Sequence, residues 1–190
     1  QGVVLQEPLW VILLAEGLAP FAPGRLFLSK DEVFNPELLA ASRLFNEYFG
    51  FGLSSIVFQE IREKKALAYS AYIYMATPSN KDKSHYLNAY IGTQADKLSD
   101  ATAAMFELMN NMPEAEMQFN AAKEAVIKKL ESTWVTGSSV YWEYESVRDL
   151  GLDYDVNRRI YEEIKNITLD DLKAFFDAHV KGKSYHICVI

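Results

Sequence analysis

The fold is decided by residues 44–70, which read LFNEYFGFGLSSIVFQEIREKKALAYS. The apolar residues at its start belong to a helical pattern that ends at Gly50, a residue type that commonly stops helices. Ser54 or Ser55 is then suited to cap a second helix, because a serine hydroxyl can accept from the free amides of a first turn. This second helix ends near Lys65, and strand-forming residues follow it. The pattern therefore predicts helix, turn, helix and strand in that order.

The residues on either side of this stretch predict a β-hairpin and the start of the first helix. Residues 67–77 are rich in tyrosine, isoleucine and small side chains, which favours a strand. A polar loop at 78–82 leads to a second strand at 85–93, which we expect to pair antiparallel with the first. Upstream, Asn35 is suited to cap a helix and Pro36 to begin it, because the first helical position needs no N–H.

The rest of the chain is mostly helical and ends in a strand that begins near Ser184. Thr93 with Asp96, and Thr168 with Asp171, resemble capping boxes that open helices. Apolar residues recur at helical spacing within five segments, at 98–112, 119–130, 140–147, 156–164 and 172–176. The predicted class is α+β, with a mainly antiparallel sheet and helices packed on one face. The other face, which carries tyrosines, is then free for a ligand or a partner domain.

Length and composition restrict the kind of protein. The 190 residues suit one large domain, and 49% of them are hydrophobic, which is enough for a buried core. The formal charge is -7 and no dense Lys/Arg stretch exists, so the sequence predicts no nucleic-acid binding. The apolar run at 9–15 is shorter than the roughly 20 residues of a membrane span. Cys188 is the single cysteine, so no internal disulfide can form.

The chain divides into a short segment and one domain. Residues 1–26 form an apolar segment to which the sequence assigns no role. The prolines within residues 1–30 leave room for at most two short strands. Residues 27–190 contain no repeat or linker and predict a single domain. The chain begins without Met and ends on an apolar run, so we expect it to be a fragment of a longer protein.

The sequence shows no catalytic centre of its own. His85, His179 and His186 fit neither His-Glu-x-x-His nor its inverse, His-x-x-Glu-His, so we expect no zinc site in this chain. It has no Gly-x-Ser-x-Gly nucleophile motif and no phosphate-binding loop. We therefore expect that the isolated chain does not hydrolyse peptides.

Two hydrogen-bond donors offer a more specific hypothesis. Arg62 lies near the end of the second helix, and Tyr69 begins the next strand seven residues later. If both point to one place, they can bind a carbonyl oxygen and stabilise the negative charge that develops on it during peptide hydrolysis. The alternative is ordinary: an arginine at a helix end is usually solvated, and a tyrosine in a strand usually packs.

Residues 44–70 resemble the stretch that identifies the C-terminal-type, non-zinc-binding domain of the M16 (pitrilysin/insulinase-type) zinc metallopeptidases. The shared features are a glycine-containing turn, two small polar residues, an Arg-Glu pair and then Leu-Ala-Tyr-Ser. The resemblance extends over residues 27–190. Phe51 and Ala66 stand where the family often has glycine, so we expect a less open turn and a stiffer link before Leu67.

The resemblance implies a role for this chain inside a larger enzyme. M16 enzymes enclose a peptide chamber between two homologous halves, and another domain holds the zinc through His-x-x-Glu-His and a distant Glu. That zinc-binding domain would lie in the same polypeptide or in a partner subunit. By position in the motif, Arg62 and Tyr69 would hydrogen-bond the peptide substrate near the scissile bond. Similarity to relatives that look exported also predicts the bacterial periplasm or envelope.

Three functions fit the sequence. The leading one is a substrate-binding domain of a zinc metalloendopeptidase. The second is a non-catalytic M16-like scaffold or interaction subunit, as occurs in respiratory complexes, and the third is a module that binds extended peptides at a sheet edge. The presence of both Arg62 and Tyr69 favours the first, since a scaffold has no need of the pair.

Overall fold

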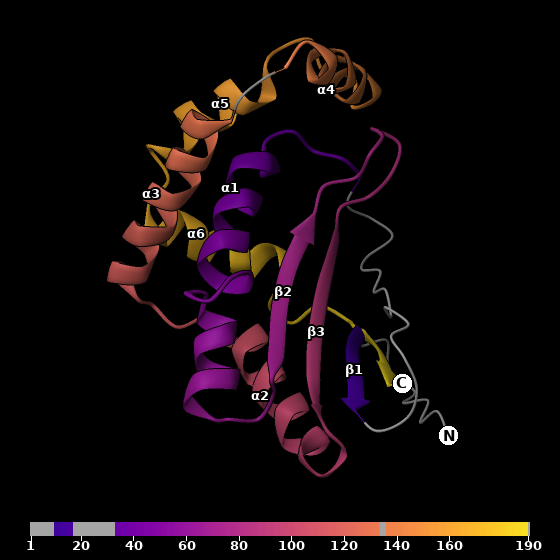
Figure 1. Cartoon of the computed structure of the whole chain (residues 1–190), viewed down its shortest axis with the longest axis vertical. Coiled ribbons are helices and arrows are strands. Elements are labelled where there is room, and N and C mark those ends of the chain that lie inside the picture. Colours follow the sequence, from indigo (N-terminus) through magenta and orange to yellow (C-terminus); the bar gives the residue numbers. More distant parts are fainter. Residues whose placement is uncertain (1–9, 17–32, 134–135, 190) are drawn as a thin grey trace.

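The computed structural model describes residues 10–16, 33–133 and 136–189, and Figure 1 shows their arrangement. In chain order the elements are β1 (Trp10–Glu16), α1 (Leu38–Phe45), the π-helical segments η1 (Asn46–Gly50) and η2 (Phe58–Lys64), β2 (Ser70–Ala76), β3 (Tyr86–Gln94), the 3-10 turn η3 (Ala95–Lys97), α2 (Leu98–Asn110), α3 (Glu116–Ser132), α4 (Gly137–Asp149), α5 (Val156–Ile164), α6 (Leu169–His179) and β4 (His186–Val189).

The described strands form one sheet in the order β2-β3-β1-β4. β2 and β3 pair antiparallel, with Tyr72 opposite Tyr90, which confirms the predicted hairpin. β1 runs parallel to both of its neighbours, β3 and β4, and so places Trp10–Glu16 inside the sheet. The predicted α+β class is confirmed, while the two parallel pairings were not foreseen, because the proline-broken residues 1–30 gave no register. The remainder of the 1–26 segment lies outside the described residues.

The two faces of the sheet differ in burial. Along β2, Ala71, Ile73 and Met75 are buried, whereas the tyrosines between them are only partly covered. The buried face packs against the helices, and α1, α3 and α6 lie to one side of β2 in Figure 1. The largest fully buried side chains of this core are Phe45, Tyr48, Phe49, Phe176, Leu44, Ile61, Ile73, Leu87 and Ile91. Burial of these apolar surfaces is the main source of stability.

The outer edge of β2 is closed by η1. The side-chain amide of Asn46 donates to the Met75 carbonyl at 2.9 Å and accepts from the Met75 amide at 2.7 Å. Gly50 lies directly against the Ile73 carbonyl, so that a Cβ atom on Gly50 would overlap that oxygen. An added strand needs these same backbone groups, so the β2 edge does not offer the site that a sheet-edge peptide binder requires.

The two expected capping boxes have different outcomes. Thr168 and Asp171 form one at the start of α6, as predicted. The prediction for Thr93 and Asp96 is wrong. Thr93 belongs to β3, and its hydroxyl donates to the Leu67 carbonyl at 2.5 Å instead of capping a helix. Strand pairing continues through Thr93, so this residue has strand backbone and does not take the N-cap position of a helix.

Candidate functional site

Arg62 projects from η2 into solvent. Its guanidinium lies over the Phe58 ring, 4.7 Å from the centroid, and its Nε is 3.7 Å from a carboxylate oxygen of Glu63. The side chain is 43% exposed, so this ion pair is weak and is easily exchanged for another acceptor. This exposure is what the ordinary alternative, a solvated arginine at a helix end, also expects, and it leaves the guanidinium accessible to a ligand.

The link between η2 and β2 is tied to the body of the domain. Ala66 has a left-handed backbone with φ of 50°, a conformation that glycine adopts at lower cost. The ammonium of Lys97 donates to the Ala66 carbonyl at 3.1 Å. One residue later, the Leu67 amide donates to the Ile61 carbonyl at 3.0 Å, and the Leu67 carbonyl accepts from Thr93. These contacts fix the path of the chain toward Tyr69.

Tyr69 is positioned by Gly92 on the neighbouring strand. The Tyr69 amide donates to the Gly92 carbonyl at 3.0 Å, and the ring lies over the glycine. A Cβ atom on Gly92 would be 2.8 Å from Cε1 of Tyr69 and 3.1 Å from the hydroxyl oxygen of Tyr90. Tyr69 is 45% exposed in this position. The absence of a side chain at Gly92 is thus what allows the ring to lie where it does.

Arg62 and Tyr69 line the same cavity. It has a volume of about 370 Å³, and its walls are Arg62, Glu63, Ala66, Leu67, Ala68, Tyr69, Thr93, Gln94 and Lys97. A cation and a phenol on one open wall can both donate to a carbonyl oxygen that enters the cavity. The sequence named the two donors but missed the residues that position Tyr69 and the link before it, which are Gly92, Thr93 and Lys97. Strand register brings these residues close, and no local pattern indicates it.

The described residues do not fit a zinc ion. None of them forms a group of three or more His, Cys, Asp or Glu side chains that could hold a metal. His85 is buried, stacks on Phe34, and accepts from the Asn35 amide through Nε2, which uses one of its two possible ligand atoms. His179 lies against Phe175 at the end of α6. In the same part of the chain, no helix has the length and apolar character needed to cross a bilayer.

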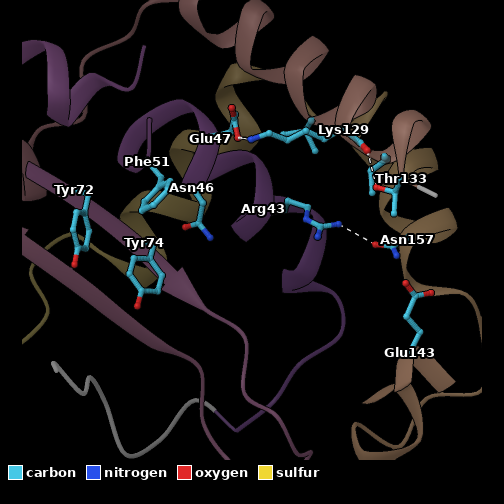
Figure 2. Close-up of a pocket in the computed structure, with 12 residues that line it drawn as sticks. Arg43, Asn46, Glu47, Phe51, Tyr72, Tyr74, Lys129, Thr133, Glu143 and Asn157 are labelled. Carbon is cyan, nitrogen blue, oxygen red and sulfur yellow. Dashed lines mark hydrogen bonds and ion pairs between the residues drawn. The ribbon is translucent and has the colours of Figure 1, made fainter. Parts of the chain in front are cut away.

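A second and larger cavity lies beside the β2 edge (Figure 2). Its volume is about 880 Å³, and α1, η1, β2, α3, α4 and α5 all contribute to its walls. Phe51, Tyr72 and Tyr74 lie on one side of it, and Arg43 with Asn157 on the other. The sequence indicated the tyrosine-bearing face but not this cavity, because Arg43 and Asn157 are 114 residues apart.

The fold and the cavity define an α+β domain that presents hydrogen-bond donors on an open wall. The sequence profile of the family described as Peptidase M16 inactive domain matches residues 24–126, more than half of the chain. The chain therefore belongs to the Peptidase M16 inactive domain family, as the resemblance predicted. No curated protein sequence matches it.

Solved structures show the same fold. A peptidase M16 inactive domain from Pseudomonas fluorescens superposes with a TM-score of 0.66 at 17% identity, covering 96% of this chain and 43% of that one. A protease from Helicobacter pylori gives 0.67 at 16%, covering 97% and 45%. A chain of complex III2 from Candida albicans gives 0.58 at 17%, covering 90% and 42%. This chain thus spans less than half the length of each.

Proposed function

We propose that this chain is the substrate-binding domain of an M16 zinc metallopeptidase. Zinc would be held by another domain, in the same polypeptide or in a partner subunit, and would supply there the activation of water for peptide hydrolysis. The observation that carries the proposal is the placement of Arg62 and Tyr69 on the wall of one open cavity, both with exposed side chains. Family membership supports it, and the isolated chain is proposed to be inactive.

The contribution of this chain is to hold the peptide and stabilise charge. Arg62 and Tyr69 donate hydrogen bonds to a backbone carbonyl oxygen of bound peptide near the bond that is cut. When water adds to the reacting carbonyl, negative charge develops nearby, and donors already in place stabilise it without rearranging. The ties from Lys97 and Thr93 to the link before Tyr69 supply this rigidity.

Replacing the guanidinium tests the proposal. In the intact protein, Arg62→Ala is expected to lower peptide turnover by about 10²-fold, the effect of losing one oxyanion-type donor. Zinc content, measured by atomic absorption, should not change, because Arg62 is not a ligand. The control is Arg158→Ala, which removes an arginine that is 77% exposed, compared with 43% for Arg62, and that pairs with Glu162 on α5. Normal turnover in Arg62→Ala would remove the assigned role.

A non-catalytic scaffold is the second candidate. The likeness to a chain of complex III2 supports it, as does α4, whose side chains Val140, Tyr141, Trp142 and Tyr144 are all more than half exposed. In Figure 1 this helix stands apart from the sheet. A scaffold predicts that the intact protein co-purifies in a stable assembly and that Arg62→Ala changes no activity. The proposed location, the bacterial envelope, is tested separately by cell fractionation.

A further inference from the structure

The cavity beside the β2 edge, called here the Arg43 cleft, is large enough for a ligand of several residues. It is lined by Arg43, Asn46, Glu47, Phe51, Tyr72, Tyr74, Val126, Lys129, Leu130, Thr133, Glu143 and Asn157, and its volume of about 880 Å³ lies in the upper range of ligand pockets. Figure 2 shows charged and amide side chains at one end and aromatic rings at the other.

Arg43 is a cation without an acidic partner among the described residues. Its Nη1 donates to the Asn157 side-chain oxygen at 3.0 Å, and this amide carries no charge. Although the side chain as a whole is exposed, desolvation lowers the pKa of the guanidinium from its ordinary value. An arginine nevertheless stays protonated, so the charge is partly desolvated and uncompensated. A ligand carboxylate that binds Arg43 would neutralise its charge and would accept hydrogen bonds from the guanidinium in place of the lost water.

The other charges of the cleft show why Arg43 stands out. Lys129 pairs with Glu47 at 2.6 Å, so this cation is already neutralised within the cleft. Glu143 also lines it, and in the view of Figure 2 its carboxylate lies beyond Asn157 as seen from Arg43. Glu143 disfavours ligands that carry several acidic groups. The cleft therefore suits a ligand with one carboxylate that approaches Arg43.

The opposite end of the cleft is aromatic. The ring of Phe51 meets Tyr72 and Tyr74 edge-on, with centroid distances of 5.7 and 6.4 Å. Phe51 is 56% exposed, and burial raises the pKa of Tyr72, so the phenol stays neutral. An exposed aromatic cluster of this kind gains most from covering an apolar or aromatic side chain.

We propose that the Arg43 cleft binds the C-terminal end of a peptide, with the terminal carboxylate on Arg43 and an apolar or aromatic side chain against Phe51, Tyr72 and Tyr74. The choice of a peptide as the carrier of the carboxylate rests on the proposed function; the charge and the rings rest on the cleft alone. In the larger enzyme such a cleft would hold the C-terminal end of a substrate or of a cleaved product.

The test compares two forms of one peptide. A dye-labelled hexapeptide that ends in Phe is prepared with a free or an amidated C-terminus, and binding to the intact protein is measured by fluorescence anisotropy with a chelator present to prevent cleavage. The free acid is expected to bind about 10-fold or more tightly than the amide, as a charge-assisted hydrogen bond requires. Equal binding of the two forms would overturn the proposal.

Substitutions show whether Arg43 causes the preference for the free acid over the amide. Arg43→Met should reduce the acid-to-amide ratio to about one, whereas the control Arg158→Met, on an exposed arginine outside the cleft, should leave it unchanged. Asn157→Asp keeps the size of the side chain and gives Arg43 an internal carboxylate, so it should abolish the preference as well. Phe51→Ala should weaken both peptides equally. If the preference survived in Arg43→Met and Asn157→Asp, the assignment to Arg43 would be wrong.

Two further experiments distinguish a failure of this proposal from a failure of the proposed function. An amidated peptide with a glutamate at the penultimate position should bind like the plain amide; if it binds like the free acid, the cleft recognises a side-chain carboxylate and the terminus is not the ligand. Arg62→Ala should keep the full acid preference, because Arg62 does not line the cleft. Loss of turnover in Arg62→Ala and loss of preference in Arg43→Met therefore report on the two proposals independently.

Discussion

Two cavities among the described residues each contain an arginine, and the two arginines have different surroundings. Arg62, beside the smaller cavity, is solvated, lies over Phe58 and is near Glu63. Arg43, in the larger one, donates a hydrogen bond to a neutral amide and is partly desolvated, although the residue as a whole is exposed. The first is an exposed donor on the wall of an open cavity, and the second is a cation whose hydrogen-bond partner carries no charge. The difference shows that residue type alone does not define a role, and that burial and partners do.

Substitution of two glycines, Gly50 and Gly92, distinguishes the two cavities by experiment. The larger loss of stability is expected for Gly50→Ala. In Gly50→Ala the new methyl group meets the Ile73 carbonyl, which is backbone and cannot turn away. The free energy of unfolding should fall by about 3 kcal/mol, the upper end of the usual cost of overpacking, and acid preference in the Arg43 cleft should fall with it. Urea denaturation measures the loss. Gly137→Ala is the matched control, since its new Cβ meets nothing within 4 Å. An equal free energy of unfolding for the two variants would show that η1 can shift away from Ile73 without loss of stability.

Gly92→Ala should disturb the smaller cavity more than the larger one. Its Cβ meets the Tyr69 ring, which can rotate away, so stability changes little while the phenol moves. Turnover of the intact protein is expected to fall by about 10-fold, because a displaced donor loses its alignment. Tyr69→Phe should give a similar loss, and the double variant should be no worse than either single one. If the losses of turnover in the two single variants added in the double variant, Gly92 would not act through Tyr69.

Ala66→Gly addresses the strain next to the smaller cavity. The left-handed backbone of Ala66 costs about 1 kcal/mol, which glycine does not incur. The variant should therefore be more stable by up to about that amount in urea denaturation. The comparison is Ala174→Gly, at an exposed position within α6, which should be less stable by about 1 kcal/mol. A loss in both variants would mean that Ala66 is not strained.

The smallest effect is expected far from both cavities, at Asp171. Hydrogen bonds from Thr168 hold the pKa of the Asp171 carboxyl below its ordinary value. Since the folded-state pKa is lowered, the stabilisation is present above the unfolded-state pKa and is lost as the pH falls through the folded-state value. Asp171→Asn should thus be slightly less stable than the parent at neutral pH and equal to it in strong acid, as thermal melts at several pH values would show. Turnover and peptide binding should not change.

The parts of the fold that depend on local patterns could be predicted from the sequence. The hairpin, the five later helices and the last strand all lie within a few residues of their predicted positions, because hydrophobic periodicity is a property of neighbouring residues. The missing glycine at position 66 was also visible, and the structure gives its meaning, a left-handed backbone. Arg62 and Tyr69 could be named because they belong to one short motif.

The parts that depend on tertiary pairing could not be predicted. Thr93 matches a capping pattern, yet β1 and β3 pair through it and turn its hydroxyl toward Leu67. The parallel register of β1 and the contact between Arg43 and Asn157 join residues that lie far apart in the chain. No sequence window contains both members of such a contact, so the Arg43 cleft became visible only when the elements were packed together.

The side chain of Asn46 has a consequence for solubility. By occupying both polar backbone groups of Met75, it acts as a one-residue substitute for a neighbouring strand. Exposed strand edges are where identical chains stack into insoluble fibres. The Asn46 amide therefore hinders a second copy of this strand from pairing at this position of the β2 edge.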